Sequence, residues 1–399
     1  MRVPRRLDAA ARCRHSAPMS IDILDPAHYA ACRRPVLEAE TLPAWCYTDP
    51  AFFAAEKERV FAHAWQFVGR VEEVPQGGYL AIETVGGPVL LLRGKDGTVG
   101  AFANSCRHRG ARLAEGSGTC LRVVCPYHAW SYRLDGTLAG APGMEETAGF
   151  DNADWGLTPV RFEVWAGFVF VCYDERTPPL ADYFGDMTRR LASHGFENFV
   201  CVRRRDYRVQ ANWKLIAENA MEAYHTGTVH SASLGQQKAR ELDTTGHWDA
   251  IQVLDEASIG VLPGEKPAFA PVPGLSPEAR EGTYFTTLHP NTQFACVQDC
   301  MWWLTFHPLA ADRTLVRVGQ CFPKDAVAQA NFAEGAAPYF KRWDTGIDED
   351  NTICEAQQAG LESSLRRPGR FSGRERAVHR LNGWLLDQVL NEASAPRRI

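Results

Sequence analysis

Two short segments, each with one cysteine and one histidine, constrain this chain more than any other feature. The first reads Cys106-Arg107-His108, and after sixteen intervening residues the second reads Cys125-Pro126-Tyr127-His128. Together the two segments offer two thiolates and two imidazoles, which are common ligands of metals in proteins. Short β-type runs surround both segments, which predicts that neighbouring hairpin loops bring the four side chains to one metal site.

Two kinds of metal site accept this set of ligands. A zinc site with two cysteines and two histidines is one, but zinc fingers usually group their cysteines and then their histidines. Here the two residue types alternate along the chain. The other is an iron–sulfur cluster in which two histidines replace two cysteines on one iron, the Rieske arrangement. The flanking residues Pro126, Tyr127, Trp130 and Tyr132 would shield a redox centre, so the pattern favours the cluster.

Composition excludes several other classes of protein. Most of the twelve cysteines stand alone among the 399 residues, and no apolar secretory segment precedes them. Disulfides are therefore not expected, and a cytoplasmic location is predicted. A net charge of -5 gives no basic surface for nucleic acid. No apolar run approaches the roughly 18–20 residues that a membrane span needs, so no membrane association is expected.

Changes of pattern divide the chain into four parts. Residues 1–19 are rich in arginine and alanine, which fits a transit-like basic arm or, as we expect, a disordered extension before an initiation site at Met19. Residues 20–59 are expected to pack on the larger C-terminal domain. Short strands and glycine turns over residues 60–175 indicate a small antiparallel β domain. Residues 176–399 predict an antiparallel sheet covered by helices, so the fold class is α+β.

The C-terminal domain is expected to contain a helix that opens at Asn212 and ends at Gly227. Residues 233–282 contain many glycine, proline and acidic residues and little clear period, which indicates a long loop. Four strands follow this loop, and two helices over residues 349–364 and 375–389 are expected to close the chain.

A second set of acidic and histidine side chains lies on the helix that opens at Asn212. Glu218, Glu222 and His225 are spaced four and three residues apart, so we expect them on one face of the helix. Buried carboxylates are costly unless they are paired or bind a metal, and His230 follows five residues after His225. Two neutral imidazoles suit ferrous iron, which needs one carboxylate to complete a facial triad with open positions.

Spacing alone does not identify that carboxylate. The acids Asp348, Glu349 and Asp350 are expected in the first turn of a late helix. Negative charge in that turn is favourable because it complements the helix macrodipole. For Asp348 and Glu349 we expect this capping role.

The two cysteine–histidine segments resemble the cluster-binding segments of the Rieske ring-hydroxylating oxygenase α subunits. The similar stretches are S-C-R-H-R-G over residues 105–110, C-P-Y-H-A-W-S-Y over residues 125–132, and L-D-G over residues 134–136. The resemblance implies four ligands of a [2Fe-2S] cluster, which are the sulfurs of Cys106 and Cys125 and the imidazoles of His108 and His128.

The second constellation is similar to the mononuclear-iron segment of the same family. The similar stretches are E-N-A-M-E-A-Y-H-T-G-T-V-H over residues 218–230 and E-D-N-T-I-C-E-A-Q-Q-A-G-L over residues 349–361. The resemblance implies that Fe(II) is bound by His225, His230 and Asp350. It also implies a catalytic role for Glu222, which matches the acid that links the cluster of one subunit to the iron of its neighbour. Where this chain has Glu222, the family often has Asp. We further expect Glu218 or Asn219 to support the ligating imidazoles.

The resemblance covers roughly residues 40–390 and implies a Rieske domain followed by a catalytic domain. It implies a terminal oxygenase that uses O₂ and receives electrons from NAD(P)H through a separate reductase, with or without a ferredoxin. A homotrimer or a stacked hexamer is expected, because the two metal sites of one chain would be too far apart for fast electron transfer. A two-domain Rieske electron-transfer protein without oxygenase activity is the distant alternative.

The substrate is predicted from aromatic residues on the expected strands, with one of Trp302 and Trp303 lining the cavity. Aromatic walls suit a quaternary ammonium group through cation–π attraction, as in oxygenases of choline-, betaine- or carnitine-like compounds. They equally suit hydroxylation of an aromatic ring or an aryl carboxylate. The compact chain and the segment I-C-E-A-Q-Q-A-G-L-E-S over residues 353–363 favour the first group. Arg203–Arg205 could bind a carboxylate of the substrate, but we expect them to be a run of surface charges.

Overall fold

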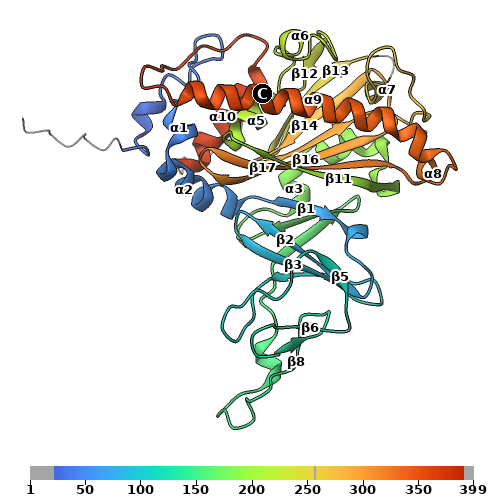
Figure 1. Cartoon of the computed structure of the whole chain (residues 1–399). Helices are drawn as coiled ribbons and strands as arrows, with labels where there is room; N and C mark the ends of the chain where they lie inside the picture. Colours follow the sequence, from blue (N-terminus) through green and yellow to red (C-terminus); the bar gives the residue numbers. More distant parts are fainter. Residues whose placement is uncertain (1–21, 256–257, 391–399) are drawn as a thin grey trace, which may run out of the picture.

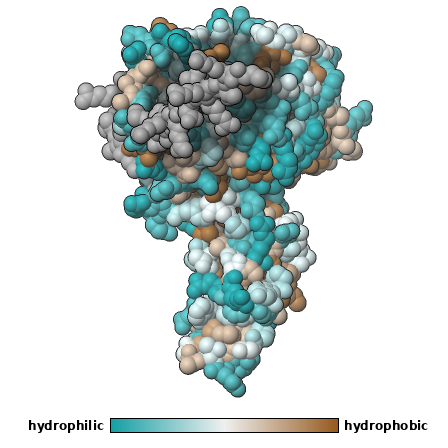
Figure 2. Space-filling view, turned by 60° about the vertical axis from the view of Figure 1, so that its left-hand side comes forward, coloured by the Kyte–Doolittle hydropathy of each residue, from teal (hydrophilic) through white to brown (hydrophobic). Residues whose placement is uncertain are grey.

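The computed structural model describes residues 22–255 and 258–390, so the extension expected over residues 1–19 lies outside the described residues. Figure 1 shows a broad body of sheet and helices, from which a narrower β region extends. Figure 2 shows the same region as a projection whose surface mixes hydrophilic and hydrophobic residues.

The narrow region consists of three small antiparallel sheets with the strand orders β1-β10-β9, β4-β3-β2-β5 and β6-β7-β8. Its strands are β1 (Gln66–Arg70), β2 (Gly78–Thr84), β3 (Gly87–Arg93), β4 (Val99–Ala103), β5 (Ser117–Thr119), β6 (Val123–Val124), β7 (Ser131–Tyr132), β8 (Leu138–Gly140), β9 (Arg161–Trp165) and β10 (Phe168–Cys172). The strands β3 and β4 form a hairpin, and its turn residue Gly97 has φ of 89°. The strands β9 and β10 form a second hairpin.

The body is built on one seven-stranded antiparallel sheet with the order β11-β17-β16-β15-β14-β13-β12. Its strands are β11 (Phe199–Val209), β12 (Ala239–Glu241), β13 (Trp248–Leu254), β14 (Gly282–Leu288), β15 (Thr292–Cys296), β16 (Met301–Ala310) and β17 (Arg313–Pro323). This confirms the α+β class and the antiparallel sheet.

The loop expected over residues 233–282 is only partly correct, because β12, β13 and the short helix α7 (Pro277–Arg280) lie within it. The strand β13 buries two polar residues, so the alternation of apolar and polar residues that would have revealed it is lost. Asp249 is buried and accepts a hydrogen bond from Arg380, and Gln252 accepts from Arg240. Arg380 lies more than a hundred residues away in the sequence, and Arg240 lies in the region expected to be a loop, so neither partner could be inferred from the local pattern.

Helices cover this sheet and the N-terminal segment packs among them. They are α1 (Trp45–Thr48), α2 (Pro50–Arg59), α3 (Leu180–Phe184), α4 (Met187–Leu191), α5 (Trp213–Asn219), α6 (Thr226–Val229), α8 (Lys324–Val327), α9 (Phe332–Leu361) and α10 (Arg376–Val389). The longest of them, α9, crosses the face of the sheet in Figure 1. None of the helices in the described ranges combines the length and apolar character that a membrane crossing requires.

The late helix has different bounds from those expected. The late helix does not begin at residue 349, because α9 already begins at Phe332 and runs through Gly335, Pro338 and Gly346. Glycine and proline normally weaken or end a helix, so these residues hid its first half from a sequence pattern. The acids at 348–350 therefore lie inside α9, and the capping role expected for Asp348 and Glu349 is wrong.

The two faces of the sheet belong to different cores. Trp302 packs on the helical face, where it stacks on Trp343 of α9 with ring centroids 4.4 Å apart. Trp303 packs on the opposite face against Phe67 of β1, with centroids 4.9 Å apart. Successive residues of a strand point to opposite faces, which explains this division. The sheet therefore connects the narrow β region, together with α3 and α4, on one side to α5, α9 and α10 on the other.

Candidate functional site: two metal centres

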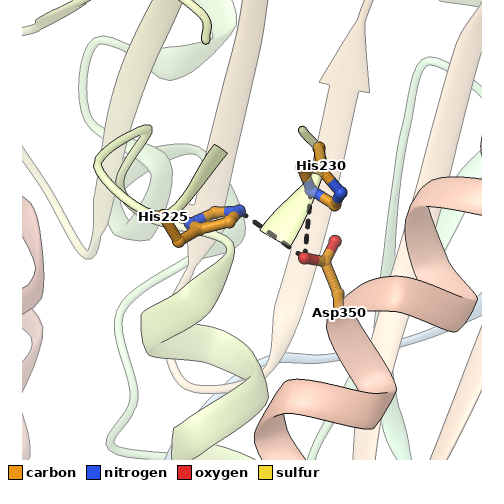
Figure 3. A group of neighbouring side chains, drawn as sticks. All are labelled: His225, His230 and Asp350. Carbon is orange, nitrogen blue, oxygen red and sulfur yellow. Dashed lines mark ion pairs between the residues drawn. The ribbon is translucent and has the colours of Figure 1, made fainter. Parts of the chain in front are cut away.

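Three side chains predicted to bind iron come together between α6 and α9 (Figure 3). His225 is the N-cap residue of the short helix α6 and His230 is its C-cap residue, so one helical turn separates them. Asp350 projects from the middle of α9. Its Oδ1 lies 3.5 Å from Nε2 of His225 and 3.2 Å from Nε2 of His230.

Each imidazole is oriented by a carboxylate on its other nitrogen. Nδ1 of His225 lies 2.6 Å from Oε1 of Glu222, and Nδ1 of His230 lies 2.7 Å from Oε2 of Glu349. Because a carboxylate accepts hydrogen bonds, these contacts place the ring protons on Nδ1 and leave the Nε2 lone pairs facing Asp350. Ser233 donates a further hydrogen bond of 2.7 Å to Glu349.

This arrangement fits a divalent metal. Oδ1 of Asp350 is buried and has no hydrogen-bond partner among the residues that the structure describes. The ligand atoms of His225, His230 and Asp350 lie within 4.8 Å of one another. Burial lowers the pKa of His230, but the carboxylates of Asp350 and Glu349 more than offset this and raise it. Two imidazoles and one carboxylate are the donor set of a facial triad for non-heme iron.

The four predicted cluster ligands lie at the far end of the narrow β region. Cys106 and Cys125 are each 3% exposed, whereas the ring of His128 is exposed to solvent. The rings of His108 and His128 are 4.8 Å apart in an edge-on arrangement. Each ligand pair occupies a tight turn, since the N–H of Gly110 donates to the carbonyl of Cys106 and the N–H of Ala129 to that of Cys125.

The surroundings of the thiols also fit a cluster. The hydroxyl of Tyr132 lies 3.3 Å from Sγ of Cys106 and accepts a hydrogen bond of 3.1 Å from the N–H of Arg107. Trp130 stacks on His108 with an interplanar angle of 5°. Two buried sulfurs beside two more accessible imidazoles match a cluster whose histidine-bound iron is nearer to solvent.

The two regions that carry these residues match known protein families. Residues 64–151 match the family described as the Rieske [2Fe-2S] domain, and residues 196–391 match the ring hydroxylating alpha subunit (catalytic domain). The glycine betaine monooxygenase oxygenase subunit of Chromohalobacter salexigens is 30% identical over 397 residues, which cover 89% of this chain and 88% of that protein. This chain belongs to the Rieske non-heme iron oxygenases.

Other relatives of this Rieske oxygenase are similar over different lengths. The carnitine monooxygenase oxygenase subunit of Escherichia coli is 38% identical over 216 residues, which cover 53% of this chain and 57% of that protein. The crystal structure of the quaternary ammonium Rieske monooxygenase CntA with γ-butyrobetaine has a TM-score of 0.74 at 25% identity, over 90% of this chain and 97% of that one. A Rhodococcus naphthalene 1,2-dioxygenase has a TM-score of 0.75 at 20% identity, over 89% and 95%, and shows the shared fold.

Membership of the family settles the broad alternatives. The protein is an oxidoreductase that incorporates molecular oxygen, and its cofactors are a [2Fe-2S] cluster and a mononuclear iron. The alternative of an electron-transfer protein without oxygenase activity is therefore wrong.

Glu222, expected to link the two metal centres, does contact His225 in this oxygenase. Glu218 and Asn219, expected to support the imidazoles, form no hydrogen bond with either histidine within the described ranges. The helix α5 ends at Asn219, before Glu222 and His225, so the single helical face predicted for them does not exist. Glu218 instead accepts a hydrogen bond of 2.8 Å from the hydroxyl of Tyr47, and burial raises its pKa to about 7. The carboxylates that orient the imidazoles are those of Glu222 and Glu349. The contact of Glu349 depends on where α9 packs, so the sequence alone could not reveal it.

A cavity lies beside the triad of the oxygenase. Phe285 and Trp343 form aromatic parts of its wall, and Arg342 is, apart from the histidines, the one cationic residue among the described residues that line it. The prediction that Trp302 or Trp303 lines this cavity is wrong, because both are packed in the cores of the sheet. Trp343, which the sequence did not single out, takes that place.

The basic run over residues 203–205 does not contribute to this cavity. Arg203 and Arg205 both form ion pairs with Asp344, at 2.8 and 2.6 Å. Arg204 forms an ion pair with Glu73 of the β region. The expectation that these arginines form a charge run rather than a substrate site agrees with these contacts.

Proposed function

We propose that this oxygenase acts on a small quaternary ammonium compound. The observation that carries the proposal is the cavity beside His225, His230 and Asp350, which is walled by Phe285 and Trp343. Aromatic faces attract an ammonium group through their quadrupoles. The names of relatives that act on glycine betaine, carnitine and choline support the same substrate class. Hydroxylation of an aromatic ring is less favoured, because the likeness to naphthalene dioxygenase extends to the fold alone.

We further propose that His225, His230 and Asp350 bind the mononuclear iron. Glu222 and Glu349 hold the protons on Nδ1 of the two histidines and so direct Nε2 at the metal. The cluster ligands in this proposal are Cys106, His108, Cys125 and His128. When bound, the iron activates dioxygen and the cluster supplies an electron, which reaches the protein from NAD(P)H through a separate reductase.

The proposed domains are residues 60–175 for the cluster and residues 176–399 for the iron, with residues 20–59 packed on the second. Support for the last part comes from Tyr29, Leu42 and Phe52, whose side chains are buried in the core formed with α5, α9 and α10. The cytoplasmic location stays a prediction from the sequence.

Electron transfer is proposed to occur between chains of a homotrimer or a stacked hexamer. In Figure 1 the cluster region around β6 and β8 lies at the opposite end of the molecule from α6 and α9. The cluster tip exposes Leu121, Val124 and Tyr127, with 79%, 53% and 54% of each residue accessible. Beside Glu222, Tyr224 is 52% exposed and borders a surface hollow. An exposed apolar tip and a hollow bordered by Tyr224 suit contact between neighbouring chains, with Glu222 as the link.

The iron content of the purified protein tests the proposal. We expect about three irons per chain in the wild type, two in the cluster and one at the triad. Asp350→Ala should lose the third iron and substrate-dependent oxygen uptake while it keeps the visible spectrum of the cluster. Oxygen uptake should be stimulated by betaines in the presence of a reductase. Full activity of Asp350→Ala would refute the assignment of the triad.

A further inference from the structure

The cavity contains a buried positive charge whose role the metal sites do not explain. Arg342 of α9 is 4% exposed and lines the cavity. Its Nε donates a hydrogen bond of 2.9 Å to the carbonyl of Ile259, and its guanidinium lies 4.2 Å from the ring centroid of Trp343. Among the described residues it forms no ion pair with a carboxylate.

An unpaired guanidinium is unusual in such a place. A buried charge is normally paired, because removal from water is unfavourable. Burial lowers the pKa of Arg342 only to about 10, so the side chain is still cationic at neutral pH. The carboxylates of Asp350 and Glu349 act on it from a distance and are already engaged with the two histidines. The terminal nitrogens are therefore available for an anion in the cavity.

Gly346 leaves room for such an anion. Arg342, Gly346 and Asp350 are spaced by four residues and lie on one face of α9. Glycine weakens a helix interior, and its φ at this position is not positive, so the backbone does not require it. A Cβ atom here would lie 3.4 Å from Nη1 of Arg342 and 3.8 Å from Cδ1 of Leu234. Both of these neighbours line the cavity.

The distances along α9 indicate the size of the ligand. Since α9 rises about 1.5 Å per residue, roughly one turn or 5–6 Å separates Gly346 from Asp350. Nη1 of Arg342 reaches over Gly346, so a carboxylate bound there would lie several bonds away from a group at the triad. A betaine-type molecule has this form, with a carboxylate at one end and N-methyl groups at the other.

We propose that Arg342 binds the carboxylate of the substrate, with Gly346 providing the space. The substrate class is then a zwitterion that carries an N-methylated ammonium group and a carboxylate, rather than a cationic alcohol of the choline type. A guanidinium binds a carboxylate through two parallel hydrogen bonds, which gives both affinity and orientation. This inference rests on the proposed quaternary ammonium function and specifies its substrate.

Binding of glycine betaine, carnitine and choline to the iron-loaded enzyme under anaerobic conditions tests the inference. Isothermal titration should show that the wild type binds a zwitterion at least tenfold more tightly than choline. Arg342→Gln should lose at least tenfold in affinity for that zwitterion, while its affinity for choline changes less than threefold. Arg203→Gln is the matched control, because Arg203 pairs with Asp344 outside the cavity, and it should bind like the wild type.

A second variant avoids dependence on the folding of Arg342→Gln. Gly346→Ala should weaken zwitterion binding at least threefold, because the added methyl group occupies the space beside Nη1. Gly360→Ala lies in the same helix, where a Cβ would meet no atom within 4 Å. It therefore receives the same gain in helix propensity and should bind normally.

The outcomes separate this inference from the proposed function. Equal binding of choline and the zwitterions, or an Arg342→Gln variant that binds zwitterions normally, would overturn the carboxylate role and leave a quaternary ammonium oxygenase. Binding and turnover of an aryl carboxylate that Arg342→Gln abolishes, without binding of any quaternary ammonium compound, would overturn the proposed substrate class. In that case Arg342 would still be the carboxylate site.

Discussion

Removal of the Glu349 carboxylate should weaken iron binding without affecting the cluster. In the structure Glu349 accepts from Nδ1 of His230 at 2.7 Å and from Ser233 at 2.7 Å. A hydrogen bond to a charged group contributes about 1.5–3 kcal/mol, and only the bond to His230 acts on the metal ligand. Since about 1.4 kcal/mol corresponds to a tenfold change, Glu349→Ala should raise the Kd for Fe(II) about 10–100-fold.

Competition with a chromogenic chelator under anaerobic conditions measures this Kd. Glu349→Gln keeps an oxygen that can accept from Nδ1, so we expect a smaller effect than for Glu349→Ala. Asp348→Ala is the matched control, because the carboxylate of Asp348 precedes Glu349 in the helix but is exposed and contacts neither histidine. The visible spectrum of the cluster should be the same in all three variants. A Kd for Glu349→Ala within threefold of the wild type would show that Glu349 does not orient His230.

Three further predictions concern buried polar groups. Lys214→Met should destabilise the protein by about 3–5 kcal/mol in denaturant unfolding, because Lys214 and Glu56 form a buried ion pair of 2.6 Å. Recovery of stability in the double variant with Glu56→Gln would confirm this cause, and an unchanged unfolding midpoint of Lys214→Met would refute it. Burial holds the pKa of Glu218 near 7, above its unfolded value of about 4.5, so stability should fall by about 3 kcal/mol as pH rises from 4.5 to 7 and then level off. Glu218→Gln should lack this pH dependence. A stability–pH profile of Glu218→Gln that runs parallel to that of the wild type would contradict the assignment to Glu218. Tyr132→Phe should lower the reduction potential of the cluster by roughly 50 mV in a spectroscopic redox titration, because the hydrogen bond to Cys106 is lost. An unchanged potential would mean that the Tyr132 hydroxyl does not donate to the sulfur.

Local sequence was sufficient for the features that one turn or one hairpin creates. The cluster segments lie in tight turns whose backbone hydrogen bonds connect residues four or five apart, such as Cys106 with Gly110. His225 and His230 likewise lie at the two ends of one short helix. Short spacing therefore brought each pair of ligands together, although the single helical face expected for Glu218, Glu222 and His225 does not form. Family resemblance added Asp350 as the expected third ligand of the iron.

The helix α9 shows where local patterns failed. Its first half contains glycine and proline, so the sequence placed its start seventeen residues too late, at residue 349 instead of Phe332. That error turned two acids in the middle of a helix into expected caps. It also hid the alignment of Arg342, Gly346 and Asp350 on one face.

The sequence by itself determined the chemistry of this protein, since its ligand types and spacings indicate a cluster and a mononuclear iron. Only the tertiary structure decided what surrounds that chemistry. Glu349 meets His230 across more than a hundred residues of chain, and Trp343 rather than Trp302 lines the cavity. These contacts depend on how α9 packs against α5, α6 and the sheet. Such packing balances many weak, non-local interactions, and no short stretch of sequence records the result.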